Sequence, residues 1–311
     1  MFGKEEKSFR LLSMYEILSK GGNLEKAKIA SDFGVSPKTV QRDINDLRAF
    51  LTESHSDDGG PDIRYDKTSN SYSLMRSARE WLTREEALAI VKILLDSRAF
   101  PKEEIKTLSD KLIGQTLPDD SAVIRDIARN ELFYYVQPRH GKNILPALWE
   151  LSEMIRGRET AKFTYERQDG KRGEREARPV AVMFSEFYFY LVAYTADGSH
   201  DFPAVFRIDR IENIRGTGKK FSVPYEKKFS EGEFRKRVQF MYPGELQRVT
   251  FDFKGDSIEA VLDRLPTAEI VSEREGVYTV TAEVYGKGID MWLRSQGDFV
   301  SGIKIREVRR K

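Results

Sequence analysis

The stretch from Phe33 to Leu47 constrains the fold of this 311-residue chain more than any other part of its sequence. Gly34 suits a residue that ends one helix in the left-handed conformation, because glycine has no Cβ to oppose a positive φ. Ser36 suits the N-cap of a second helix, and Pro37 suits its first position, where a missing N–H costs nothing. The sequence therefore predicts two helices joined by a tight turn.

The second of these helices has an apolar side and a polar side. Its apolar residues recur at helical spacing and predict a buried stripe of Val40, Ile44, Leu47 and Leu51. Its polar side carries Lys38, Arg42 and Asn45, flanked by Thr39, Gln41 and Arg48. Such side chains bond phosphates and base edges when a helix lies in the major groove of DNA. A solvated helix face is the ordinary alternative, and the flanking sequence favours DNA binding.

The flanking elements complete a winged helix-turn-helix, which we place at residues 1–76. An amphipathic helix upstream carries Leu11, Leu12, Tyr15 and Leu18 and ends at Gly21-Gly22. A short helix before the turn carries Ile29, Ala30 and Phe33. Downstream, residues 63–65 and 71–74 alternate polar and apolar around residues 67–70, which is a hairpin pattern.

The spaced residues of this unit resemble the DeoR-type N-terminal domain of bacterial transcription regulators. The resemblance rests on Ile29-Ala30, Gly34-Val35-Ser36, the run from Thr39 to Ile44, and Leu47. It implies double-stranded operator DNA as a partner. We expect the DNA-binding residues to be Ser36, Lys38, Thr39, Gln41, Arg42, Asn45, Arg48, Arg64 and Lys67.

The charge balance of the N-terminal segment predicts a homodimer. Residues 1–53 hold nine basic and eight acidic side chains, so a generic electrostatic attraction to DNA is absent. Useful affinity then has to come from the local placement of basic groups and from the doubled contacts of a dimer on an inverted repeat.

Composition bounds the other possibilities. The chain is 40% hydrophobic and 33% charged, with a net charge of +2, as expected for a globular protein of several domains. No apolar run approaches the roughly 20 residues that span a bilayer, and we expect no membrane partner and no signal peptide. The absence of cysteine favours the cytoplasm. Three widely separated histidines make a metal site unfavourable, and we expect no cofactor.

Residues 77–142 predict a helical connector. A capping-box pattern at residues 83–86 precedes an apolar face of Ala87, Leu88, Ile90, Val91, Leu94 and Leu95. A second helix opens at Pro101 and carries Ile105, Leu108, Leu112 and Ile113. A third follows residues 119–121 and carries Val123, Ile124 and Ile127. Such stripes are more often core or dimer contacts than ligand sites.

Residues 143–226 predict a helix followed by about five short strands. The helix runs from Ile144 to Ile155 and carries Trp149 and Leu151. Strands are predicted at residues 161–166, 175–182, 187–194, 204–208 and 211–214, with a hairpin at Asp169-Gly170. Pro179 suggests an edge or a bulge. Short strands closely spaced by turns favour a small barrel over a sandwich.

This strand-rich segment resembles the WYL domain, an Sm-like barrel that senses effectors in bacterial regulators. The resemblance rests on Phe163–Tyr165, Arg178-Pro179, Phe189-Tyr190-Leu191 and the run from Phe206 to Ile211. Phe189 stands where the signature has tryptophan, and Ala204 where many relatives have a basic residue. The resemblance implies an effector site lined by Tyr165, Arg178, Tyr190, Arg207 and Arg210.

The residue types in this segment suggest what the effector is. Arginine forks bind phosphate oxygens and aromatic faces stack on bases, which suits a nucleotide or a single-stranded nucleic acid. Structural roles are the alternative for single residues. Phe163, Phe189 and Leu191 suit a barrel core, and Arg210 could pair with Asp209 or Glu212.

Residues 227–311 predict a ferredoxin-like α/β sandwich. Strand and helix patterns follow one another in the order βαββαβ between Val249 and Ile305. With the run from Trp292 to Gly297, this order resembles the WCX extension that follows WYL domains. The resemblance implies a role in dimerisation and effector response, and a packing domain without a site is the alternative.

Together these segments predict a multidomain α+β regulator that is not an enzyme. The sequence contains no phosphate-binding glycine loop, no nucleophile elbow and no spaced histidine and cysteine cluster. We expect a sequence-specific DNA-binding transcriptional regulator that senses an anionic effector. The alternative is a nucleic-acid-binding accessory factor without a promoter-specific role.

Overall fold

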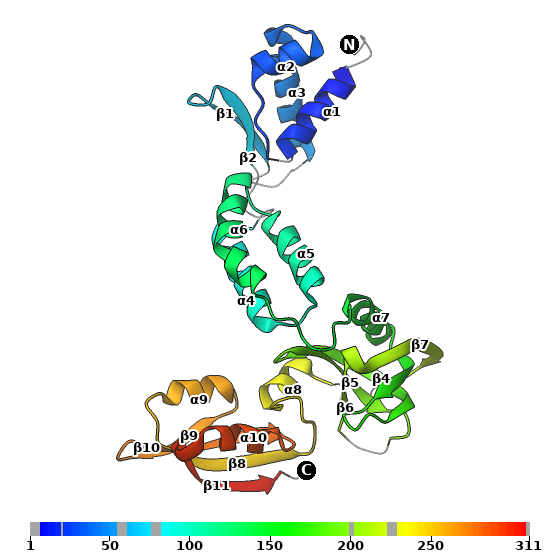
Figure 1. The fold of residues 1–311 in the computed structure, drawn as a ribbon, viewed down its shortest axis with the longest axis vertical. Helices are drawn as coiled ribbons and strands as arrows, with labels where there is room; N and C mark the ends of the chain where they lie inside the picture. Colours follow the sequence, from blue (N-terminus) through cyan, green and yellow to red (C-terminus); the bar gives the residue numbers. More distant parts are fainter. Residues whose placement is uncertain are drawn as a thin grey trace. The chain divides into compact units, whose positions relative to one another are not determined.

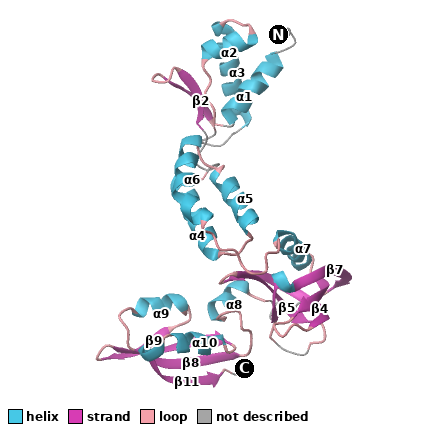
Figure 2. Ribbon diagram, in the orientation of Figure 1, coloured by secondary structure: helices cyan, strands magenta, loops and turns pink. Residues whose placement is uncertain are grey.

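The computed structural model describes residues 7–19, 21–54, 61–75, 82–198, 202–222 and 229–308 (Figure 1). The chain forms two compact units, Met1–Asp96 with Lys102–Val136, and Ser97–Pro101 with Gln137–Lys311. Each unit combines helices with antiparallel sheet, so the predicted multidomain α+β class is confirmed (Figure 2). The predicted boundaries at 76/77 and 226/227 lie outside the described residues and stay predictions. No helix in the described ranges has the length and apolar character needed to cross a bilayer.

The first unit begins with three helices and a hairpin. These elements are α1 (Lys7–Ser19), α2 (Lys26–Phe33), α3 (Pro37–Ser54), β1 (Asp62–Asp66) and β2 (Ser71–Met75). Gly34 ends α2 in the left-handed region with φ 62° and ψ 33°. Ser36 Oγ accepts a hydrogen bond from the Thr39 amide at 3.1 Å, and Pro37 is the first residue of α3. The predicted turn chemistry is therefore confirmed.

The core of these elements contains the predicted stripe and one ion pair that the pattern does not reveal. Val40, Ile44, Leu47 and Leu51 are buried, together with Asp43. Asp43 accepts from Nε of the buried Arg10 at 2.6 Å, which joins α3 to α1. Leu12 does not lie on the buried side of α1, so its prediction as part of the apolar side of this helix is wrong; its side chain is 67% exposed. The buried side of α1 instead follows the four-residue spacing of Arg10, Met14 and Leu18.

Three further helices complete the first unit. They are α4 (Arg84–Ser97), α5 (Lys102–Ile113) and α6 (Pro118–Phe133). The predicted capping box is confirmed, because the Thr83 amide donates to Glu86 Oε2 at 2.9 Å and the Glu86 amide donates to Thr83 Oγ1 at 3.2 Å. The apolar stripes are narrower than predicted. Exposed side chains within the predicted stripes are Ile90, Val123 and Ile127.

The second unit contains a five-stranded antiparallel sheet with the order β6-β5-β4-β3-β7. Its elements are α7 (Leu145–Arg156), β3 (Glu159–Glu166), β4 (Arg172–Ser185), β5 (Tyr188–Thr195), β6 (Ala204–Arg207), the 3₁₀ turn η1 (Ile208–Arg210) and β7 (Ile211–Lys220). Leu151 of α7 is buried with Phe163 and Leu191, whereas Trp149 is 71% exposed. Pro179 lies in an interior strand at a register shift, so it marks a bulge and not an edge.

The last part of the second unit has the predicted βαββαβ order. Its elements are α8 (Glu231–Arg237), β8 (Leu246–Phe253), α9 (Ile258–Arg264), β9 (Glu269–Arg274), β10 (Val277–Tyr285), α10 (Gly288–Ser295), η3 (Gly297–Phe299) and β11 (Val300–Glu307). The four strands form one antiparallel sheet with the order β11-β8-β10-β9. Helix α8 precedes this βαββαβ unit and lies outside the predicted pattern, which begins at Val249. Its Phe234 is buried with Ala181, Met183 and Val192 of the five-stranded sheet.

Replacing Asp43 with alanine should destabilise the packing of α1 on α3 by about 3–5 kcal/mol, because the buried Arg10 guanidinium loses its partner charge. Amide hydrogen exchange of α1 and α3 in the full chain measures this effect. Asp46→Ala is the matched control, because Asp46 pairs with Lys7 at the surface, where ion pairs contribute little. Equal loss of protection in the two variants would contradict the assignment.

Candidate functional site

The polar side of α3 presents two basic side chains to solvent. Lys38 and Arg42 are exposed. Neither has a hydrogen bond or an ion pair with another residue in the described ranges. They lie one helical turn apart on the N-terminal half of α3, next to the capped turn that begins the helix. Both charges are therefore available to an anionic partner.

Gln41 and Arg48 do not face solvent in the same way, because they join α3 to the hairpin. Gln41 is half-buried, and its Oε1 accepts from the Tyr72 hydroxyl at 2.7 Å and from Lys26 Nζ at 3.2 Å. Arg48 donates to the Ile63 carbonyl from Nε at 2.8 Å and from Nη2 at 2.6 Å. These bonds hold β1 and β2 against α3.

The hairpin is also attached on its other side. The amides and carbonyls of Leu24 and Tyr72 exchange two hydrogen bonds of 2.8 Å, which places the segment before α2 next to β2. Tyr72 is buried, and its ring lies beneath Lys26 Nζ and the Arg48 guanidinium at 5.6 and 5.7 Å. The hairpin and α3 thus form one fixed surface.

The other predicted DNA-binding residues lie on this surface with local roles. The hydroxyls of Ser36 and Thr39 bond one another at 3.0 Å within the cap of α3. Arg64 pairs with Asp62 at 3.5 Å on β1. Lys67 is exposed in the turn of the hairpin. The structure therefore brings all the predicted residues onto α3, its cap and the hairpin.

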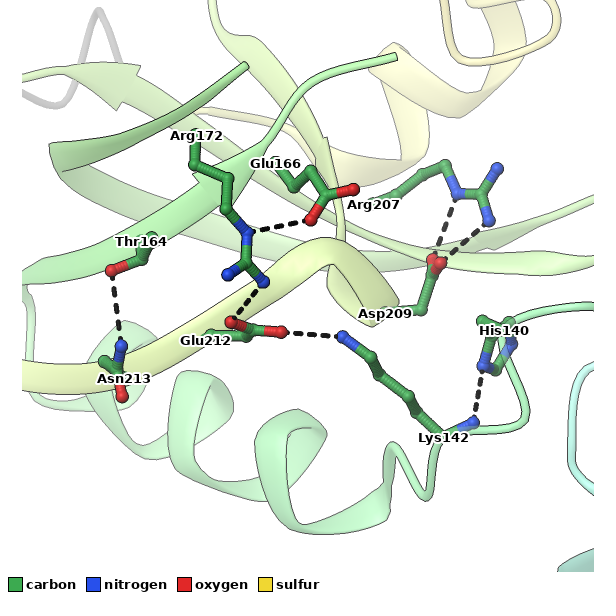
Figure 3. A network of polar contacts seen from close by, with 9 residues as sticks. All are labelled: His140, Lys142, Thr164, Glu166, Arg172, Arg207, Asp209, Glu212 and Asn213. Atoms are coloured by element: carbon green, nitrogen blue, oxygen red, sulfur yellow. Dashed lines mark hydrogen bonds and ion pairs between the residues drawn. The ribbon is translucent and has the colours of Figure 1, made fainter. Parts of the chain in front are cut away.

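A second polar cluster surrounds Arg207 at the end of β6. Its guanidinium donates to Asp209 from Nε at 3.0 Å and from Nη2 at 2.8 Å (Figure 3). The guanidinium carbon lies 3.4 Å from the centre of the Tyr188 ring. The Arg207 amide donates to the Tyr165 hydroxyl at 3.3 Å. The sequence suggests Asp209 as a partner of Arg210. In the structure, Asp209 forms a bidentate ion pair with Arg207 instead.

Two titratable side chains border the Arg207 cluster. Tyr190 lies opposite Arg207 in the sheet, and burial raises the pKa of its hydroxyl to about 12. His140 lies with its ring centre 6.3 Å from that of Tyr188. Burial lowers the pKa of His140 below its ordinary value of 6.5, and the Asp209 carboxylate opposes this shift. Both shifts thus favour the neutral form of the side chain.

Next to this cluster runs a chain of exposed ion pairs (Figure 3). Glu212 accepts from Lys142 Nζ at 2.9 Å and from Arg172 Nη2 at 2.8 Å, while Arg172 Nε also donates to Glu166 at 2.9 Å. The Lys142 amide donates to Nδ1 of His140 at 3.0 Å. Basic and acidic groups balance along this chain, so it does not create a strongly positive surface.

The structure does not bring Arg178 and Arg210 into the Arg207 cluster. Arg178 lies opposite Tyr194 in the sheet and donates from Nη2 to the Thr195 carbonyl at 3.1 Å. Its Nε is buried without a hydrogen-bond partner among the described residues. Arg210 has no interaction with Arg207 in those ranges. Of the predicted five, the structure brings Tyr165 and Tyr190 next to Arg207, and the effector role of all five stays a prediction.

Sequence reasoning missed three members of the cluster, namely His140, Tyr188 and Asp209. The position of Asp209 two residues after Arg207 is a usable signal, because a short turn after a strand lets such residues face one another. His140 precedes the segment by many residues, and no local pattern points to it.

Residues 146–215 match the WYL domain family. This match confirms the WYL resemblance for the strand-rich segment and covers the helix α7 and most of the five-stranded sheet. The Arg207 cluster therefore belongs to the WYL domain, with His140 and Lys142 contributed by the residues just before it.

Whole-chain comparisons match this chain to a curated relative and to several solved structures, among them the two below. The relative is YobV of Bacillus subtilis (strain 168), named as an uncharacterised HTH-type transcriptional regulator; it is 24% identical over 251 residues, covering 77% of this chain and 78% of that protein. Proteasome accessory factor B/C of Arthrobacter aurescens matches with a TM-score of 0.31 and 18% identity, covering 96% of this chain and 44% of that one. A CRISPR Cas-related protein matches with a TM-score of 0.34 and 13% identity, covering 86% and 68%. This chain thus spans less than half of the first of these structures.

Replacing Asp209 with asparagine should lower the pKa of His140 further, because the carboxylate that favours the imidazolium is removed. Proton NMR titration of the His140 ring measures this pKa, with His140→Gln used to assign the signal. Asp169→Asn in an exposed turn is the matched control. A rise in the pKa on Asp209→Asn would contradict this electrostatic account.

The same shift predicts how stability depends on pH. A histidine with a lowered pKa binds fewer protons in the folded state than in the unfolded state. The contribution of neutral His140 to the free energy of unfolding is therefore fully present above pH 6.5, and it is lost as the pH falls through the pKa of His140 in the folded state. His140→Gln should remove this pH dependence from the amide protection of β5 and β6.

Proposed function

We propose that this chain is a sequence-specific DNA-binding transcriptional regulator, with a DeoR-type winged helix-turn-helix in residues 1–76 and an effector-sensing WYL domain. One observation carries the DNA-binding part. Lys38 and Arg42 are exposed and unpaired among the described residues, on a helix whose attachment to the hairpin is fixed by Gln41 and Arg48. Helix α3 acts as the recognition helix, and β1 and β2 act as the wing.

The electrostatics of the N-terminal segment support a homodimer on an inverted repeat. Nine basic and eight acidic side chains in residues 1–53 give little non-specific attraction. Two of these acidic groups, Asp43 and Asp46, are paired with Arg10 and Lys7. Lys38 and Arg42 on α3 keep their charges unpaired among the described residues, and a single recognition helix contacts only a few base pairs. We propose that residues 227–311 help to form the dimer.

The Arg207 cluster supports effector binding at the WYL domain, which we propose to be an Sm-like barrel. A nucleotide or a short single-stranded nucleic acid is the ligand class that suits it, because Tyr188 and Tyr190 offer aromatic faces and Arg207 offers a guanidinium. Arg207 already donates two N–H groups to Asp209. The anionic effector competes with Asp209 for this fork, and release of Asp209 is the event that the protein transmits. No catalytic step is part of this function.

Arg42→Ala and Lys38→Ala should each weaken operator binding without unfolding α3, because both side chains lie off the buried stripe. The expected loss is about 1–3 kcal/mol for a base contact, and about one unit of salt slope for a phosphate contact. Gel-shift titration at several salt concentrations measures both. Lys111→Ala on α5 is the control for loss of an exposed charge.

Footprinting on the DNA upstream of the protein's own coding region tests the proposal as a whole. We expect a discrete protected inverted repeat with two half-sites. Uniform coverage would favour the alternative accessory factor. Unchanged affinity in both Arg42→Ala and Lys38→Ala would show that the polar side of α3 is not the DNA-binding surface.

Arg207→Ala should abolish the response of operator binding to the effector while leaving operator binding itself intact. Isothermal calorimetry with nucleotides and short oligonucleotides measures effector binding, and gel shift with and without the bound ligand measures operator binding and its response. Arg215→Ala, which removes an exposed arginine paired with Glu174 on the same sheet, is the matched control. Equal binding by Arg207→Ala and the unchanged protein would refute the effector site.

A further inference from the structure

The two amide side chains on the polar side of α3 have their oxygen atoms engaged by the protein itself. Gln41 Oε1 accepts from the Tyr72 hydroxyl at 2.7 Å and from Lys26 Nζ at 3.2 Å. An amide oxygen has two lone pairs, so both are used. Gln41 Nε2 donates to Asn45 Oδ1 at 3.3 Å.

The side-chain oxygen of Asn45 also accepts hydrogen bonds from the protein itself. Its Oδ1 accepts from Gln41 Nε2 at 3.3 Å and from Arg48 Nη1 at 3.5 Å. Arg48 is itself held by two bonds to the Ile63 carbonyl. The hydrogen bonds therefore run from the hairpin through Gln41 to Asn45, and back to the hairpin through Arg48.

The chemistry of the end groups fixes which way both amides point. A lysine ammonium and an arginine guanidinium can only donate, so the amide atom that faces each of them has to be oxygen. Lys26 imposes this on Gln41, and Arg48 imposes it on Asn45. The nitrogen atoms are then the parts left for an outside partner. Gln41 Nε2 keeps one unused N–H, and Asn45 Nδ2 keeps two.

The unpaired charged groups of α3 are also hydrogen-bond donors. Lys38 and Arg42 can only donate. Asp43 is buried with Arg10, and Asp46 pairs with Lys7. The Ser36 and Thr39 hydroxyls bond one another in the cap. Along positions 38, 41, 42 and 45, the outward surface of α3 therefore presents hydrogen-bond donors.

We infer that α3 reads hydrogen-bond acceptors on base edges, selecting guanine or thymine where Asn45 makes contact and disfavouring cytosine where Gln41 makes contact. This inference rests on the proposed DNA-binding function. Guanine offers two acceptors, N7 and O6, and thymine offers O4, whereas adenine offers N7 beside an amino donor and cytosine offers only a donor in the major groove. The usual bidentate pairing of an amide with adenine needs the amide oxygen, which is occupied here. The two free N–H groups of Asn45 should thus favour guanine over adenine and cytosine by roughly 5- to 100-fold, and the single free N–H of Gln41 should favour bases with an acceptor over cytosine.

Tyr72 is a positioning residue in this scheme, because it acts on base choice only through Gln41. Tyr72→Phe removes the 2.7 Å bond and frees one lone pair of Gln41 Oε1. The freed oxygen can accept from the adenine amino group. Tyr65→Phe is the matched control, since the Tyr65 hydroxyl lies on the same hairpin and bonds Asn70 instead of Gln41.

Selection of bound duplexes from a randomised pool by the full chain tests the inference. The unchanged protein should enrich a discrete site, and the base that Asn45→Asp converts to cytosine should be a guanine or a thymine, which also identifies the contacted strand. Asn45→Asp keeps an oxygen facing Arg48 and replaces the outward nitrogen by an acceptor. It should move the preference at that position to cytosine by about tenfold, in line with carboxylate contacts to cytosine.

The tyrosine pair supplies the second arm of the experiment. Tyr72→Phe should raise the relative affinity for adenine at the Gln41 position by roughly 3- to 10-fold, and Tyr65→Phe should leave it unchanged. Conversion of an adenine to cytosine on the same strand by Asn45→Asp, or equal preferences in Tyr72→Phe and Tyr65→Phe, would overturn this inference alone. Enrichment of no sequence would overturn the proposed function with it.

Discussion

The buried ion pair between Arg10 and Asp43 sets how α3 is held within the first unit. The two side chains are 9% and 2% exposed, and their N–O distance is 2.6 Å. A charge at this depth is tolerated only with a partner, so the register of α1 against α3 is fixed to the one that joins these groups. Apolar contacts among Met14, Leu18 and Val40 alone would permit neighbouring registers at lower cost. The orientation of the outward side of α3 follows from this register.

Polar bonds, more than apolar contacts, then connect α3 to the hairpin. Gln41 and Arg48 lie beside the apolar stripe and bond Tyr72 and Ile63. A hairpin of two short strands is marginal alone in water. Its attachment therefore depends on the same side chains that border the exposed face of α3. Under the proposed DNA-binding role, structure and recognition are coupled here, because moving the hairpin would release the amide groups that limit which base edges the helix can bond.

The sequence predicts the local turn and capping interactions, whereas it does not predict which side chains pair across the tertiary fold. Gly34, Ser36 and the Thr83–Glu86 capping box act over a few residues, so their backbone consequences follow from residue type. The order and approximate bounds of the strands follow from alternation and turns. The sequence does not predict that Asp43 is buried, because a pattern cannot show that Arg10 lies opposite it. The sequence also does not show how far Arg178 lies from Arg207, because that distance depends on the register of the sheet.

The Arg207–Asp209 pair shows how an internal carboxylate can set the threshold for an outside anion. Asp209 is buried and bidentate, and it is only two residues from Arg207, so it acts at a high effective concentration. A simple anion has to displace it and leave a buried carboxylate without its partner, which is costly. A ligand that also stacks on Tyr188 or Tyr190 gains energy that a simple anion lacks. In the proposed effector site, the pair would thus favour ligands that join an anionic group to an aromatic ring over inorganic anions.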